Sequence, residues 1–102
     1  MKQRFMVVYE HGKQNYGGFA PDVPGCISTG KTLSKIRSMM REALESHLEF
    51  MAADGDPMPV PATTNFDLST IDDPNGEVDH YVVELMEIEV PVFRQTREAL
   101  TA

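Results

Sequence analysis

The stretch Tyr16-Gly-Gly-Phe-Ala-Pro-Asp-Val-Pro-Gly-Cys-Ile-Ser-Thr-Gly30 decides how this chain folds. Its first part, residues 16–20, is short, aromatic and bounded by glycine, which is typical of a strand. Val23-Pro-Gly-Cys26 places proline and then glycine at the two central positions of a tight turn, and this order predicts a type II turn. Residues 26–29 then predict a second short strand, which ends at Gly30.

A single long helix is predicted directly after this hairpin, over residues 32–53, with Thr32 as the residue that caps its first turn. Gly55 and Pro57 are the expected stop. The apolar positions follow the three- and four-residue spacing of one helix face. These positions are Leu33, Ile36, Met40, Ala43, Leu44, His47 and Met51, and Met39 and Phe50 widen the stripe.

Two longer strands are predicted at the ends of the fold, over residues 4–10 and 80–90. The first alternates Phe5, Val7 and Tyr9 with Met6 and Val8, so both of its faces are apolar and we expect a central strand. The last strand carries Val82, Met86, Ile88 and Val90 on one face, and Tyr81, Val83, Leu85, Glu87 and Glu89 on the other.

The predicted order is therefore β-β-β-α-β, an α+β fold with a four-stranded mixed sheet and one long helix on one face. The simplest arrangement has the last strand beside the first and parallel to it, after a right-handed crossover. One helix covers one face of a sheet whose two faces are both apolar. We therefore expect the chain to form a homodimer or a tetramer.

The chain of 102 residues predicts a single domain over residues 1–90, with a long loop at 56–79 and a tail at 91–102. Phe66, Leu68 and Ile71 are expected to pin the loop to the domain. The only cysteine, Cys26, has no partner for an internal disulfide, which favours a reducing compartment. No apolar run approaches the roughly 20 residues of a membrane span, and the first residues do not resemble a signal peptide, so we expect a cytoplasmic protein.

The hairpin motif GGFAPDVPGCISTGKT (17–32), a helix that contains Glu-Ala-Leu (42–44), and the closing DGDPMPVP (54–61) together resemble the HicB-like antitoxin family. The resemblance covers residues 4–61, and the strand at 80–90 fits behind it. Lys31 stands where the family usually has an acid. Ser34 and Lys35 stand where it often has glutamates, which removes the reciprocal half of the capping box.

The resemblance implies a reduced ribonuclease-H-like layout and an antitoxin that neutralises a small basic HicA-like mRNA-cleaving toxin by protein contact. It leaves open a second role, a stand-alone oligomeric domain in regulation or ligand binding. Family members commonly carry a DNA-binding segment after the last strand. Only residues 91–102 follow here, too few for a helix-turn-helix, so we do not expect direct DNA binding.

Charge is distributed unevenly along the chain. The net charge is −7, yet residues 42–90 carry thirteen acids and no lysine or arginine. Such a segment suits a basic partner and repels duplex nucleic acid. Our candidate partner-binding residues are Asp72, Asp73, Glu87 and Glu89. A basic cluster at the helix start (Lys31, Lys35, Arg37, Arg41) is interpreted as a solvated face rather than a phosphate site.

The sequence offers weak signals for catalysis or metal binding. Cys26 with His11, His47 or His80 would resemble a nucleophile and base, but a buried thiol and unrelated histidines explain the pattern better. The densest carboxylates are Asp72-Asp73 and the group Glu84, Glu87 and Glu89, which point to different strand faces and define no Mg²⁺ site. Nuclease chemistry needs several convergent acids, and the first strand is apolar where one would sit. We expect no catalytic residue, metal or cofactor.

Overall fold

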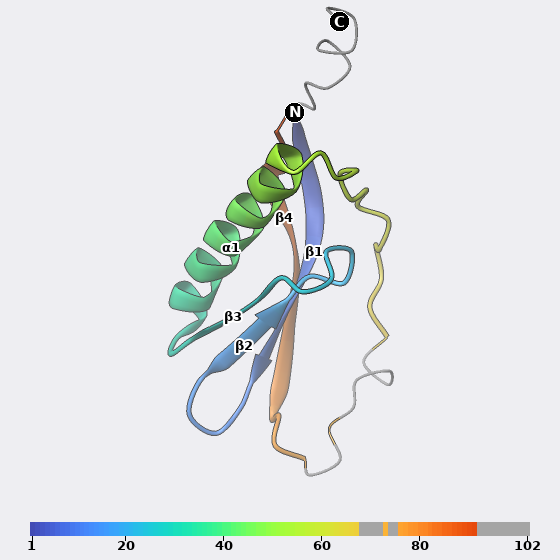
Figure 1. Ribbon diagram of the computed structural model, residues 1–102. Helices are drawn as coiled ribbons and strands as arrows, with labels where there is room; N and C mark the ends of the chain where they lie inside the picture. The colour runs from blue at the N-terminus through green and yellow to red at the C-terminus, as the bar shows by residue number, and fades with distance from the viewer. Residues whose placement is uncertain (68–72, 74–75, 92–102) are drawn as a thin grey trace, which may run out of the picture.

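The computed structural model describes residues 1–67, 73 and 76–91. Its elements, in chain order, are β1 (Lys2–His11), β2 (Tyr16–Phe19), β3 (Ile27–Gly30), α1 (Leu33–Ala53) and β4 (His80–Glu89). The strands form one sheet in the order β3-β2-β1-β4, and α1 lies across one face of it (Figure 1). The predicted α+β class, element order and central position of β1 are confirmed.

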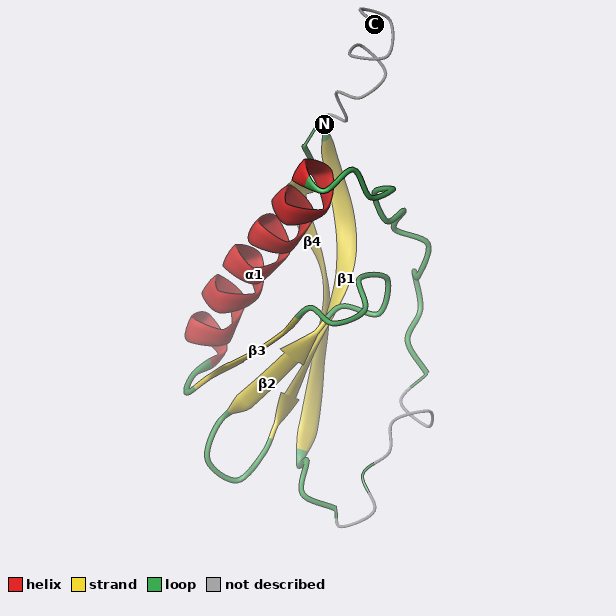
Figure 2. Ribbon diagram, in the orientation of Figure 1, coloured by secondary structure: helices red, strands yellow, loops and turns green. Residues whose placement is uncertain are grey.

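The direction of β4 differs from the prediction. β4 lies beside β1, as expected, but runs antiparallel to it, so the sheet is antiparallel throughout rather than mixed. Figure 2 shows the reason: α1 carries the chain along the molecule in one direction, and the loop after it carries the chain back before β4 begins. The prediction counted only the helix as a crossover. The right-handed rule concerns parallel strands and does not apply here.

The turn between β2 and β3 has the predicted type. The Cys26 N–H donates to the carbonyl of Val23 at 3.1 Å, and Gly25 has a φ of 87°, the positive value that a type II turn needs at its third residue. Two other glycines allow α1 to approach the hairpin. A Cβ atom on Gly18 would lie 2.8 Å from Cγ of Met40, and one on Gly30 would lie 2.8 Å from the backbone nitrogen of Ile36.

Both ends of α1 follow the sequence prediction. The Lys35 N–H donates to Oγ1 of Thr32 at 3.0 Å, so Thr32 is the N-cap. At the other end Gly55 has a φ of 77°, and its N–H donates to the carbonyl of Ala52. The next N–H donates back to the carbonyl of Met51 at 2.9 Å, which completes a Schellman motif.

The main core lies between α1 and the sheet, and it contains no buried polar side chain among the described residues. Phe5, Val7 and Tyr9 of β1 are fully buried there. On the helix the buried residues are Ile36, Met40, Leu44 and Leu48. The prediction missed Leu48 and was wrong about Phe50, whose side chain is 72% exposed. Phe50 follows Leu48 by two residues, a turn of about 200° around the helix.

The long connection after α1 is held against the hairpin by Asp22. Its Oδ2 accepts the N–H groups of Ala62 and Thr63 at 2.9 and 2.8 Å, and its Oδ1 accepts the Thr63 hydroxyl at 2.7 Å. The ring of Phe66 packs edge-on against Phe19, with centroids 5.8 Å apart. The predicted role of Phe66 in pinning the loop is therefore confirmed, whereas Leu68 and Ile71 lie outside the described residues.

Candidate functional site

The face of the sheet away from α1, here called the outer face, carries a continuous apolar row. The strand register places Ile27, Phe19, Val8 and Val83 side by side across all four strands. In the neighbouring row Met6 pairs with Leu85. Met6 and Val8 are buried, but Ile27, Val83 and Leu85 are 72%, 41% and 49% exposed. The described chain therefore covers the centre of the outer face and leaves apolar side chains open toward β4 and β3.

Glu87 and Glu89 continue the outer face beyond Leu85. They occupy the same face of β4, because side chains two residues apart in a strand point the same way. Both side chains remain exposed, at 51% and 62%. Arg4 lies 4.0 Å from the Glu87 carboxylate. A hydrogen bond from the Met1 amino group lowers the pKa of Glu89.

β4 is also an edge strand of the sheet. Across the β1–β4 ladder the Val90 N–H donates to the Met1 carbonyl at 2.8 Å. In this register the backbone N–H and C=O groups of the even-numbered residues of β4 point toward β1. The odd-numbered residues then direct their backbone groups outward, and Nη1 of Arg41 donates to the Glu87 carbonyl there at 2.8 Å. Val83, Leu85, Glu87 and Glu89 thus present their side chains on the outer face and their backbone groups at the free edge of the sheet.

Of the other two predicted acids, the one that the structure describes lies at the opposite end of β4. Asp73 precedes the strand, and its carboxylate accepts the N–H groups of Glu77 and Val78 at 3.0 and 3.1 Å, so it closes the turn that leads into β4. Asp72 falls outside the described residues. Glu87 and Glu89 pair with Arg4 and Lys2 at the start of β1, whereas the turn at Asp73 lies at its end. The structure therefore does not bring Asp73 together with Glu87 and Glu89.

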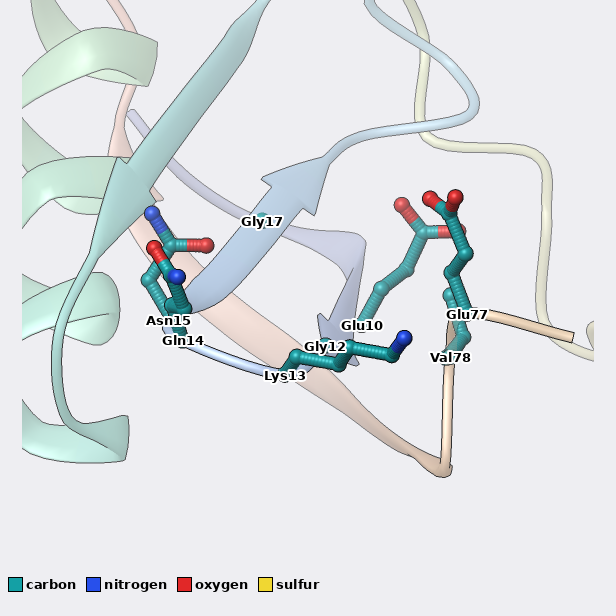
Figure 3. A pocket seen from close by; sticks show the side chains of 8 residues that line it. All are labelled: Glu10, Gly12, Lys13, Gln14, Asn15, Gly17, Glu77 and Val78. Atoms are coloured by element: carbon teal, nitrogen blue, oxygen red, sulfur yellow. The ribbon is translucent and has the colours of Figure 1, made fainter.

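A shallow pocket of about 400 Å³ lies beside this turn, between the β1–β2 loop and the segment before β4. Figure 3 shows the side chains of Glu10, Glu77 and Lys13 among those that line it. Burial, and then the charge of Asp73, raises the pKa of Glu10. This pocket combines two acids with one lysine. It could not be recognised in the sequence because its residues come from two segments that are far apart in the chain.

Two members of the basic cluster at the start of α1 are bound to β4. Arg37 lies 3.2 Å from the Glu84 carboxylate, which also accepts the hydroxyl hydrogen of Tyr9. Burial, with the adjacent Glu84 carboxylate, raises the pKa of Tyr9. Arg41 donates to the Glu87 carbonyl, as described above. These contacts fasten the helix to β4, a structural role that the interpretation of the cluster as a solvated face did not include.

The cysteine considered as a nucleophile occupies an unsuitable environment. Cys26 is 3% exposed and belongs to the apolar core, where burial raises the pKa of its thiol, the opposite of nucleophile activation. Val7 and Val8 are fully buried at the β1 positions where a nuclease carboxylate would be expected. Asp22, whose loop contacts are described above, was missed as a structural residue. An aspartate between two prolines in a turn was the available signal.

Comparison with solved structures shows that this small antiparallel sheet under one helix is the fold of an antitoxin domain. The chain superposes on the N-terminal domain of the Burkholderia pseudomallei antitoxin HicB with a TM-score of 0.60 and 25% identity, covering 86% of this chain and all of that one. It superposes on a chain from a "HicA3 and HicB3 toxin-antitoxin complex" with a TM-score of 0.58 and 23% identity, over 88% and 100% of the two chains.

The sequence profile of the HicB_like antitoxin of bacterial toxin-antitoxin systems matches residues 5–101. This chain belongs to that family. Two curated relatives match part of the chain. A 14.9 kDa protein of Haemophilus phage HP1 is 36% identical over 55 residues, and a UPF0150 protein of Thermotoga maritima is 39% identical over 44 residues. These matches cover 54% and 43% of this chain, and 41% and 59% of the relatives.

The comparisons confirm the resemblance that the hairpin motif indicated. The family is described by an antitoxin role and not by an enzyme activity. In the part of the chain that the structure describes, no helix is long and apolar enough to cross a membrane.

Proposed function

We propose that this chain is an antitoxin that binds a small basic HicA-like mRNA-cleaving toxin and neutralises it by protein contact. The proposal rests mainly on one observation: the exposed apolar residues Val83 and Leu85 are followed, on the same face of β4, by the exposed acids Glu87 and Glu89. Family membership and the similarity to a chain from a HicA3–HicB3 complex support this role.

The arrangement suits a protein interface. Effective interfaces combine a buried apolar centre with a polar rim. Here Val83 and Leu85 would supply the centre, and Glu87 and Glu89 the rim. Acids at the rim attract a basic partner and increase the rate of association. A toxin whose RNA-binding surface is covered is inactive, so the antitoxin needs no chemistry of its own. The site of action is the cytoplasm, where mRNA is translated.

Asp72 and Asp73 form a second proposed contact area, and Asp73 lies at the other end of β4. Their contribution is expected to be smaller, because the Asp73 carboxylate already holds two backbone N–H groups of its own turn. A partner that reached both areas would have to extend along most of β4. We therefore expect the stronger contact at Glu87 and Glu89.

The test is co-expression of the chain with a HicA-like toxin gene that lies beside its own gene. We expect the native chain to restore growth, and the double variant E87K/E89K to lose that rescue while its circular dichroism spectrum stays native. The matched control is E42K/E49K, which reverses two exposed acids on α1 instead. Rescue that survives E87K/E89K but fails in a D72K/D73K variant would move the interface to the other end of β4.

A second candidate function is a stand-alone oligomer with a regulatory or ligand-binding role. The exposed apolar residues of the outer face favour it, since they would equally suit a second copy of the chain in a homodimer or tetramer. Sedimentation distinguishes the two. An oligomer that dissociates in a Leu85→Asp variant, together with no rescue by the native chain, would favour this alternative. Only an 11.4 kDa species would exclude it.

A further inference from the structure

Two histidines and an aspartate meet where β1 ends and β4 begins. His11 and His80 are directly opposite each other in the ladder, and Asp79 precedes β4. Oδ1 of Asp79 lies 2.7 Å from Nδ1 of His11 and 2.9 Å from Nδ1 of His80. Among the described residues, these three form the group of histidine, cysteine and acidic side chains whose ligand atoms all lie within 4.8 Å of one another.

The imidazole rings are held in place by their surroundings. The rings of His11 and His80 are stacked, with centroids 4.6 Å apart and an angle of 24° between them. Tyr16 packs against both, at 4.5 Å from His11 and 6.2 Å from His80, and it also packs against the main core. The two Nδ1 atoms therefore converge on Asp79 as part of the fold.

We propose that His11, Asp79 and His80 form a zinc-binding site. Two imidazole nitrogens and one carboxylate oxygen are ligands that zinc prefers, and three protein ligands leave the fourth position for water or an added ligand. Ligand atoms about 2.1 Å from a tetrahedral zinc lie about 3.4 Å apart. The present separations need a small opening, which the 63% exposed Asp79 side chain can provide by rotating.

The surroundings favour a cation. Glu10, Asp73 and Glu77 lie at the same end of the molecule, and Asp73 and Glu10 act on one another electrostatically. Asp79 also ends the long connection after α1, and its N–H donates to the carbonyl of His11 at 2.9 Å. A bound ion would therefore tie this connection to the end of β1. Since the unfolded chain lacks the assembled site, zinc would stabilise the folded state.

Titration of the metal-free full chain with zinc chloride tests the proposal. We expect one zinc ion bound per chain, a higher melting temperature with zinc, and loss of that increase after EDTA. H11Q/H80Q should weaken binding at least about tenfold. The matched control His47→Gln removes a histidine on α1 and should leave zinc affinity unchanged. Binding that is absent from the native chain, or equal in native and H11Q/H80Q proteins, would overturn the site.

A second measurement uses the native chain alone, so it holds even if the double variant fails to fold. Zinc should shift the imidazole nitrogen resonances of His11 and His80 together in NMR spectra, with no shift for His47. Unchanged resonances of His11 and His80 at saturating zinc would show that the two histidines only share Asp79 as a hydrogen-bond acceptor.

Discussion

The two faces of the sheet are both lined by apolar residues of β1, but they differ in how far their side chains are buried. On the helix face Phe5, Val7 and Tyr9 are fully buried under α1. On the outer face Met6 and Val8 are also buried, yet their β4 neighbours Leu85 and Val83 are 49% and 41% exposed. The pattern of a strand therefore decides which residues share a face. Whether that face is closed depends on what packs over it, and the one helix in the described part of the chain, α1, closes only one face.

The largest expected effect contrasts one position on each face. Met40→Asp places an unpaired carboxylate in the core under α1, and we expect it to lower the free energy of unfolding by about 4 kcal/mol or more. Leu85→Asp places the same group on the outer face, where we expect a change within about 0.5 kcal/mol. Urea unfolding of both variants provides the measurement. Equal losses would mean that the outer face is as closed as the helix face.

A smaller effect is expected where α1 meets the hairpin. Gly30→Ala adds a Cβ atom that would lie 2.8 Å from the backbone nitrogen of Ile36 and 3.0 Å from its Cα. Backbone atoms yield less easily than side chains, so we expect a loss of about 1–3 kcal/mol in thermal or urea unfolding. Gly12→Ala is the control, because its nearest neighbour would be 3.6 Å away. An unchanged stability of the Gly30→Ala protein would show that α1 can move away from β3 at little cost.

The hydrogen bonds that hold the long connection against Asp22 of the hairpin give a pH-dependent prediction. Burial raises the pKa of Asp22, but the hydrogen bonds from Thr63 and Ala62 outweigh it and hold that pKa below the ordinary value of 3.8. The stabilisation is therefore present above about pH 4 and is lost as the pH falls through the lowered pKa.

Asp22→Ala should cost about 1 kcal/mol at pH 7, the usual net value of such bonds where solvent screens them. The difference from the native chain should shrink toward zero as the pH falls below 3.8. Urea unfolding at a series of pH values measures it. A difference that stays constant with pH would mean that the Asp22 charge does not hold the connection.

Local chemistry made much of this fold predictable. The proline and glycine of the turn, the Thr32 cap and the Gly55 stop each act over a few residues, and all three were predicted from the sequence. The direction of β4 was not, because it depends on where a 26-residue connection between α1 and β4 leaves the chain. Leu48 was missed and Phe50 misplaced, although Leu48 follows the buried Leu44 by four residues and so lies on the same helix face.

The candidate site was predictable only in part. The alternation of β4 placed Glu87 and Glu89 on one face with Leu85, and the register confirms that placement. The sequence could not show that Asp73 lies at the other end of β4, with its carboxylate engaged by backbone N–H groups. Nor could it show that His11 faces His80, because their pairing depends on the direction and register of β4.

The most direct measurement of the central claim is an NMR titration of the labelled chain with a catalytically inactive HicA-like toxin. If the open part of the outer face is the binding surface, the largest shifts should fall on the amides of Val83, Leu85, Glu87 and Glu89. They should weaken as salt is raised from 0.1 M to 1 M, since the Debye length falls from about 10 Å to about 3 Å. Shifts confined to the exposed side of α1, at Glu42 and Glu49, would contradict the claim.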